Sequence, residues 1–140
     1  MEVTLAVLAD YCNVSSEGKL NVMGIFDVLR SPRFPCTHPA MQLVMTFEFP
    51  STELGRETPV EVQLIDTDGR KLWELPTTVI PTRAAAEESV EPFRVNQVVL
   101  VQNLTFQKPG DYEFAILVRG EEKRRVRLEV CRAGNNEQGA

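Results

Sequence analysis

The stretch KPGDYEFAILV at residues 108–118 decides the fold class. After its Pro-Gly turn, the apolar residues Tyr112, Phe114, Ile116 and Val118 occupy every second position. Such alternation turns one face of a β-strand toward a core and the other toward water. A tyrosine directly after a turn, with a core residue two positions further on, is typical of the tyrosine corner of immunoglobulin-like domains. The stretch therefore predicts a strand of an antiparallel β-sandwich.

The same alternation recurs along the rest of the chain. Turn-forming residues separate the runs at residues 16–19, 66–69 and 119–122, and each of these turns contains a glycine. The predicted strands cover residues 3–14, 20–29, 41–49, 60–65, 71–79, 93–104, 112–118 and 124–131. Because each strand offers one apolar face, two sheets packed face to face satisfy all of them. We expect an all-β, antiparallel two-sheet sandwich of about eight strands, either immunoglobulin-like or C2-like.

The remaining segments add little regular structure. One short helix is possible at residues 83–89, where an Ala-rich and Glu-rich run lies between Pro81 and Pro92. The polar, Gly-containing end at residues 133–140 has nothing to bury, so we expect a disordered tail. Without an internal repeat or a linker, residues 1–132 are predicted to form one β-sandwich domain.

Composition excludes several classes of protein. The 140 residues carry a net charge of −5 and no basic stripe, which argues against nucleic-acid binding. The three cysteines are too few and too far apart for a disulfide framework, and free thiols indicate a reducing compartment. The apolar start at residues 3–9 is too short to span a membrane and lacks the features of a signal peptide. We expect a cytoplasmic monomer or homodimer.

Three short motifs resemble a known family. They are LADY at residues 8–11, GKLNVMGIFD at residues 18–27 and PRFP at residues 32–35, followed by the PGDYEF run. In their order and spacing they resemble a widespread bacterial family of small uncharacterised β-sandwich domains, over roughly residues 3–130. The resemblance implies a β-sandwich of unknown function, with no established activity or cofactor, and it assigns a role to no residue.

Cys36 and His38 are the one candidate pair for nucleophilic catalysis. A thiolate nucleophile needs a base within hydrogen-bonding reach, and His38 is the only histidine. Positions two apart in an extended chain point the same way, so contact is possible. Prolines crowd this segment, however, and nothing marks an oxyanion hole. We therefore expect a stiff connection between sheets, with a cysteine-dependent enzyme as the less favoured alternative.

Asp66 and Asp68 form the candidate metal site. Calcium takes six to eight oxygen ligands, and the loops of β-sandwiches can gather carboxylates for it. Asp-x-Asp-Gly between two apolar runs is also ordinary hairpin chemistry, in which Asp caps the turn and Gly adopts the left-handed conformation. A small-ligand or calcium-binding regulatory domain therefore remains an alternative function.

Two basic regions are candidates for binding a partner. Arg125 and Arg127 share one face of a predicted strand, where acidic neighbours favour cross-strand ion pairs. The segment Arg30–Pro39 combines arginines, an aromatic residue and three prolines, and a rigid loop of this kind loses little entropy on binding. Its candidate contact residues are Arg30, Arg33, Phe34 and His38.

The sequence as a whole shows a complete core pattern without a catalytic set. We therefore expect a non-catalytic protein-binding or assembly module without a cofactor. Its partner would be an unidentified protein, engaged through Arg30–Pro39 or by strand addition at a sheet edge.

Overall fold

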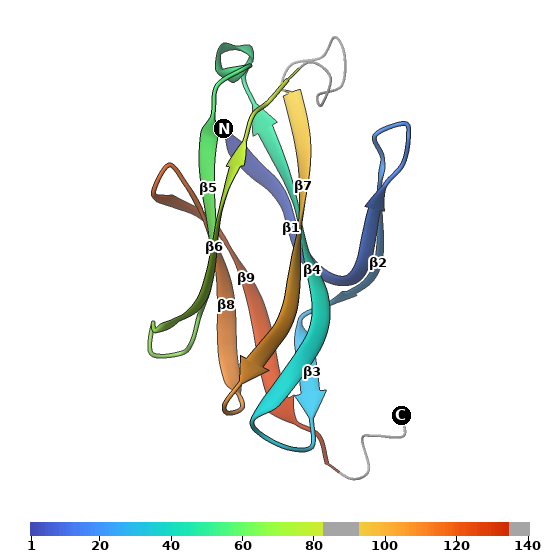
Figure 1. Ribbon diagram of the computed structural model, residues 1–140, viewed down its shortest axis with the longest axis vertical. Helices are drawn as coiled ribbons and strands as arrows, with labels where there is room; N and C mark the ends of the chain where they lie inside the picture. Colours follow the sequence, from blue (N-terminus) through green and yellow to red (C-terminus); the bar gives the residue numbers. More distant parts are fainter. Residues whose placement is uncertain (83–92, 135–140) are drawn as a thin grey trace.

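The alternating runs form nine β-strands in the computed structural model, which describes residues 1–82 and 93–134 (Figure 1). The strands are β1 (Glu2–Val14), β2 (Leu20–Phe26), β3 (Val28–Ser31), β4 (Cys36–Phe49), β5 (Thr58–Ile65), β6 (Lys71–Val79), β7 (Phe93–Phe106), β8 (Gly110–Val118) and β9 (Glu121–Arg132). A single 3-10 turn at Ser51–Glu53 is the one helical element in the described part of the chain. The all-β prediction is confirmed.

The strands form two sheets. One has four strands in the order β2-β1-β4-β7, and the other has five in the order β3-β9-β8-β5-β6. The predicted strand over residues 20–29 is wrong, because the chain leaves the first sheet at Asp27 and enters the second. This division gives nine strands where eight were expected. It also makes β3 parallel to β9, whereas every other strand pair is antiparallel.

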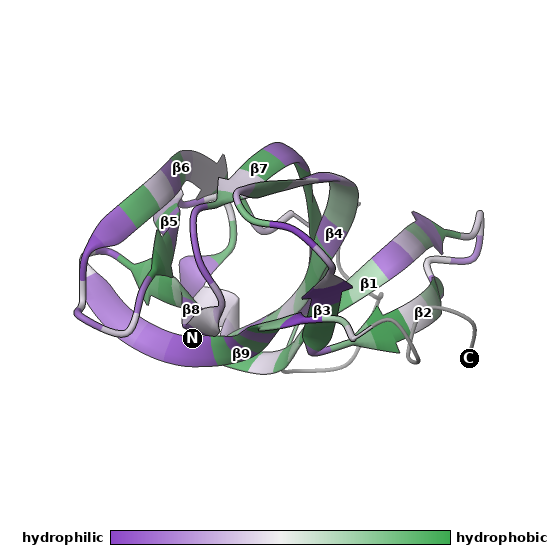
Figure 2. Ribbon diagram, turned by 90° about the horizontal axis from the view of Figure 1, so that it is seen from below, coloured by the Kyte–Doolittle hydropathy of each residue, from purple (hydrophilic) through white to green (hydrophobic). Residues whose placement is uncertain are grey.

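The core lies between the two sheets, and both contribute to it. Figure 2 shows the sheets curving around this shared interior. From β8, Phe114 packs edge-on against Trp73 of β6, with ring centroids 6.1 Å apart. The ring of Tyr112 packs edge-on against the ring of Phe106 of β7, with ring centroids 4.9 Å apart. Burial of these large side chains, each worth roughly 1.5–3 kcal/mol, is the main force that holds the sheets together.

Tyr112 makes the kind of hydrogen bond to an upstream carbonyl that is typical of a tyrosine corner. The hydroxyl of Tyr112 donates to the carbonyl of Lys108, four residues earlier, at 2.6 Å. The bond ties the start of β8 to the turn that precedes it. Burial raises the pKa of Tyr112, and the charge of Asp66 raises it further, so the phenol stays neutral and remains a donor.

Two predictions fall outside what the structure describes. The helix expected at residues 83–89 lies wholly within the undescribed segment 83–92. Of the predicted tail, Ala133 donates its backbone N–H to the carbonyl of Ser31 at 2.9 Å, and residues 135–140 are not described. The single domain over residues 1–132 stays a prediction. Across the described ranges, no helix is long and apolar enough to cross a membrane.

Candidate functional site

The Arg30–Pro39 segment is mostly strand. Arg30 belongs to β3 and lies opposite Cys131, while β4 begins at Cys36, so only residues 32–35 connect the two strands. Phe34 packs against the core, and the guanidinium of Arg132 lies 5.4 Å from its ring centroid. Arg33 is exposed and accepts a hydrogen bond from the hydroxyl of Ser31 through its carbonyl. Phe34 is thus partly buried against the core, and Arg30 and Arg33 are exposed.

Cys36 and His38 lie close in the chain, but their side chains do not contact each other through a hydrogen bond. Both lie at the start of β4, and no hydrogen bond joins their side chains. The imidazole of His38 instead packs against the ring of Phe26, with centroids 6.1 Å apart. Its Nε2 atom is buried without a hydrogen-bond partner among the described residues. The ring of His38 is thus positioned by Phe26 and not by the Cys36 thiol.

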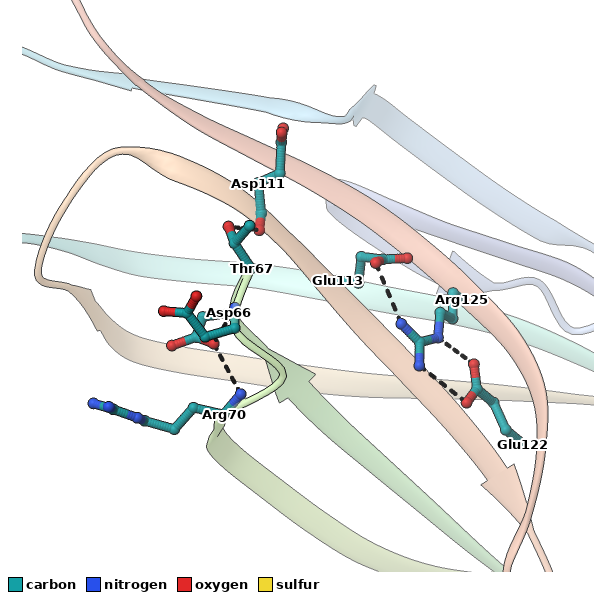
Figure 3. A network of polar contacts seen from close by, with 8 residues as sticks. Asp66, Thr67, Arg70, Asp111, Glu113, Glu122 and Arg125 are labelled. Atoms are coloured by element: carbon teal, nitrogen blue, oxygen red, sulfur yellow. Dashed lines mark hydrogen bonds and ion pairs between the residues drawn. The ribbon is translucent and has the colours of Figure 1, made fainter.

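Asp66 is committed to a turn between β5 and β6. Its Oδ1 atom accepts the backbone N–H groups of Asp68 at 2.9 Å and of Arg70 at 2.8 Å (Figure 3). The hydroxyl of Thr67 donates to the carbonyl of Asp111 and joins this turn to β8. In residues 1–82 and 93–134, no three His, Cys, Asp or Glu residues lie close enough to hold a metal ion. The hydrogen bonds accepted by Asp66 are those of an Asp that caps a hairpin turn.

The basic face of β9 is neutralised by ion pairs. Arg125 contacts Glu122 through two nitrogens and Glu113 of β8 at 3.3 Å, as Figure 3 shows. Arg127 pairs with Asp111 at 3.1 Å. The hydrogen bond from Arg125 lowers the pKa of Glu122, so the acid stays charged. These contacts match the expected cross-strand ion pairs and leave no isolated positive patch.

A groove that the sequence did not reveal lies beside β9. A cavity of about 410 Å³ separates the middle of β9 from β1 and the end of β2. Its apolar lining comes from both sheets, and charged groups stand at its rim. The residues that line it, called the β9 groove from here on, are Ala6, Val7, Leu8, Ile25, Phe26, Asp27, Arg125, Val126 and Arg127.

The β9 groove exists because β9 is only half covered on one side. β3 pairs with residues 129–132 of β9, and no described strand pairs with residues 121–127 on that side. Glu129 donates its backbone N–H to the carbonyl of Asp27 at 2.8 Å, which shows that this N–H points to the β3 side. Backbone groups alternate between the two sides of a strand. The N–H and C=O groups of Arg125 and Arg127 therefore point to the open side.

β1 has a matching open edge across the groove. β2 pairs with β1 only from Leu8 onward, so no described strand pairs with residues 2–7 of β1 on that side. The guanidinium of Arg124 donates to the carbonyl of Val3 at 3.2 Å and bridges the two strand edges at the end of the groove nearest the start of β9. Asp27, where the chain crosses from one sheet to the other, lies at the opposite end of the groove. Between these two ends, the unpaired edge of β1 faces residues 125–127 of β9.

The wall of the groove continues into an exposed apolar face of the β1–β2 hairpin. Tyr11 lies opposite Met23 and Ala9 opposite Ile25, so these side chains share one face. Ile25 is 63% exposed although it lines the groove. Gly24 adopts a φ of +70°, and a side chain there would collide with the carboxylate of Asp10. The LADY and GKLNVMGIFD motifs thus meet at the contact of Asp10 with Gly24.

Sequence reasoning missed the groove because its residues are distant in the chain. The signal that was available is the Asp27 position, where the run GIFDVL keeps its apolar character but contains a charged residue. A chain that changes sheets at this point leaves parts of its neighbours unpaired. Only the strand register shows which parts those are.

The fold and the groove define an all-β protein with an interrupted sheet edge. A family model describes residues 4–131 of this sequence as a family of unknown function, DUF6941. The protein belongs to that family. The resemblance proposed from the motifs is confirmed, and no curated protein sequence matches the chain.

Solved structures share only a general likeness. An alkylpurine DNA glycosylase, AlkC, from Pseudomonas fluorescens bound to DNA is 14% identical, with a TM-score of 0.49 over 91% of this chain and 31% of its own. A β-glucosidase from Listeria innocua is 10% identical, with a TM-score of 0.48 over 90% of this chain and 16% of its own. A bacterial adhesin from Mobiluncus mulieris is 12% identical, with a TM-score of 0.40 over 88% and 56%. This chain thus spans under two thirds of each.

Proposed function

We propose that this protein is a non-catalytic protein-binding module that accepts an extended segment of a partner at the open edge of β9. The observation that carries the proposal is the stretch over residues 121–127 of β9, which no described strand pairs with on one side, beside a cavity of about 410 Å³. Added strands gain affinity from main-chain hydrogen bonds and specificity from pockets for alternate side chains. The β9 groove offers both.

The state of Cys36 and His38 supports a function without catalysis. His38 contacts Phe26 and lacks a hydrogen bond to the thiol, an arrangement that favours a function without a thiolate nucleophile at Cys36. All three cysteines are free, which supports the proposal that the protein works in a reducing compartment such as the cytoplasm.

We also propose that the two sheets are of the immunoglobulin-like type rather than the C2-like type. The bond from Tyr112 to Lys108 supports this assignment, because the tyrosine corner is a hallmark of immunoglobulin-like sandwiches. In such a domain the edges of the two sheets lie beside each other, which is where the β9 groove is found.

A pair of substitutions at one position tests the proposed function. Arg125→Pro removes the backbone N–H that points to the open edge, and its ring blocks an added strand. Proline is tolerated at edge positions whose N–H faces solvent, so the fold should survive. Arg125→Ala is the matched control, since it loses the same ion pairs but keeps the N–H.

Peptides selected from a random displayed library on the immobilised protein serve as the probe. We expect them to bind the wild-type protein and the Arg125→Ala variant, and to bind Arg125→Pro at least about tenfold more weakly, as the loss of one main-chain anchor predicts. Arg33→Ala separates this site from the Arg30–Pro39 segment. Loss of binding in Arg33→Ala with normal binding in Arg125→Pro would overturn the groove as the binding site.

A further inference from the structure

The β1–β2 hairpin leaves the first sheet and turns back along its outer side. β1 pairs with β4 as far as Ala9, and from Asp10 onward β2 is its one partner among the described strands. Figure 1 shows β1 running down from the N-terminus and then reversing upward into the hairpin. In Figure 2 the hairpin lies on the outer side of β4, away from the shared interior. Residues 10–24 are called the arm from here on.

The tip of the arm contacts β7, the strand on the other side of β4. The side-chain amide of Asn96 donates to the carbonyl of Gly18 at 3.5 Å, and its oxygen accepts the hydroxyl of Thr46 at 2.9 Å. Asn96 of β7 lies opposite Thr46 of β4, whereas Ala9 lies opposite Gln42. The arm therefore spans the outer face of β4 from the level of Gln42 to the level of Thr46.

The burial of Val44 shows that the outer face of β4 is covered between these two levels. Its neighbours Leu43 and Met45 belong to the core, so the side chain of Val44 points to the outer face. An outward side chain of a two-sheet sandwich ordinarily meets water. Val44 is nevertheless 0% exposed. The path of the arm across this face accounts for its burial.

The arm has a buried underside and an exposed upper face. Cys12 is 7% exposed and its cross-strand partner Val22 is partly buried, whereas Tyr11 and Met23 are 46% and 58% exposed. Because side chains alternate between the two faces of a hairpin, Cys12 and Val22 face the sheet. Burial raises the pKa of the Cys12 thiol above its ordinary value, which suppresses the reactive thiolate while the arm is closed.

The base of the arm has the features of a hinge, and few contacts hold the arm down. Gly24 has a φ of +70°, and the carboxylate of Asp10 occupies the space where a side chain of Gly24 would lie. The contacts with the sheet are one long hydrogen bond from Asn96 at the tip and the small underside around Cys12 and Val22. Segments with few buried apolar contacts open at a lower free energy than the whole fold.

From this geometry we infer that the arm is a hinged strap, which opens and closes over the outer face of β4 while the two-sheet core stays folded. It turns about Asp10 and Gly24, and the hydrogen bond from Asn96 to Gly18 holds it closed. Opening exposes Val44 on the sheet and the thiol of Cys12 on the arm. The arm ends before Ile25, which lines the β9 groove, so a failure of peptide binding at that groove would leave this inference standing.

Thiol labelling of the wild-type protein with iodoacetamide measures the opening. Tryptic cleavage separates the three cysteines, because Cys12, Cys36 and Cys131 fall in the peptides 1–19, 34–56 and 128–132, so mass spectrometry reads each one alone. The open population derived from Cys12 labelling should exceed, by at least about tenfold, the globally unfolded population derived from hydrogen exchange of core amides in β8. The rate should also change little at low urea, because opening the arm exposes little surface. Labelling of Cys12 at the rate and with the urea dependence of global unfolding would overturn the inference.

A pair of variants on β7 tests the contact that holds the arm closed. Asn96→Ala removes the hydrogen bond to Gly18, so Cys12 should be labelled several-fold faster. Gln102→Ala is the matched control, since Gln102 is exposed on the same strand but lies opposite Ala40, outside the span of the arm. Urea denaturation of both variants shows whether global stability has changed. Equal labelling of Cys12 in the two variants would contradict the assigned contact.

Discussion

The two halves of β9 differ in what lies beside them. The closed half, from Leu128 to Arg132, has β8 on one side and β3 beside residues 129–132, whereas the open half, residues 121–127, pairs with β8 alone among the described strands. In the closed half, Leu128 and Val130 are fully buried, and in the open half Val126 is only partly buried. Apolar and polar residues alternate from Arg125 to Val130, across the border between the two halves. The difference arises from the path of β2 and β3, and it shows that a single strand can be part core and part docking edge.

The largest expected effect distinguishes the two halves by stability. Leu128→Ala removes a buried side chain from the closed half and should lower the free energy of unfolding by about 2–5 kcal/mol. Val126→Ala in the open half should lower it by about 1 kcal/mol, because the site is already partly open to water. Urea denaturation measures both values. Equal losses would mean that the open half is packed as tightly as the closed half.

The next effect concerns the strand that forms the outer wall of the groove. Gly24→Ala introduces a side chain at positive φ and against the carboxylate of Asp10, so it should destabilise the protein by more than about 1–2 kcal/mol. Gly120→Ala is the matched control, since Gly120 has a φ of +80° and open space around it. The difference in melting between the two variants measures the collision with Asp10. If Gly24→Ala costs no more than Gly120→Ala, the contact with Asp10 contributes nothing.

A smaller effect is expected at the closed end, where Tyr112 lies opposite Leu128. Tyr112→Phe removes the hydrogen bond to Lys108 and should cost about 1 kcal/mol. Burial raises the pKa of Tyr112 above its ordinary value of about 10, so the folded protein holds this proton more tightly than the unfolded chain. The resulting stabilisation is complete below about pH 10 and is lost as the pH rises through the folded-state pKa.

Thermal melts of the wild-type protein and Tyr112→Phe between about pH 8 and about pH 11 test this dependence. The wild-type protein should lose stability more steeply with rising pH than the variant. Parallel curves would show that Tyr112 titrates with its ordinary pKa in the folded protein.

The smallest effect on stability belongs to the ion pairs of the open half. The hydrogen bond from Arg125 lowers the pKa of Glu122, so this contribution is present at neutral pH and is lost as the pH falls through the lowered pKa. Both side chains are largely exposed, and exposed ion pairs contribute little. Glu122→Gln should therefore leave the melting temperature at pH 7 nearly unchanged. A large decrease would mean that the ion pairs hold β9 in place.

The sequence predicts the strands well and their neighbours poorly. Alternation placed Tyr112 and Phe114 on the buried face, and the pattern of a tyrosine after a turn is accompanied in the structure by the bond from Tyr112 to Lys108. Residues 20–29 read as one strand because apolar residues continue on both sides of Asp27. The crossing there depends on β9, about a hundred residues later, and a local pattern carries no information on so distant a partner.

The same limit applies to the candidate residues. The Asp66 turn is local, and the pattern Asp-x-Asp-Gly correctly suggested hairpin chemistry. The stiff connection expected at residues 30–39 does place Phe34 against the core, whereas its contact with Arg132, about a hundred residues later, has no signal in the local sequence. The β9 groove combines residues from three separate parts of the chain and leaves no continuous motif.

The pairing of β3 with β9 has a consequence for how the chain folds. During synthesis, β3 leaves the ribosome about a hundred residues before β9, and until then it has no strand to pair with. Contacts between such distant segments slow folding, because a long loop must close before they form. We therefore expect the local β1–β2, β5–β6 and β8–β9 hairpins to form first, with the parallel pair among the last native contacts. Unpaired strand edges in the unfinished protein are sites of misassembly. We therefore expect chaperones to matter most in the interval before β3 pairs with β9.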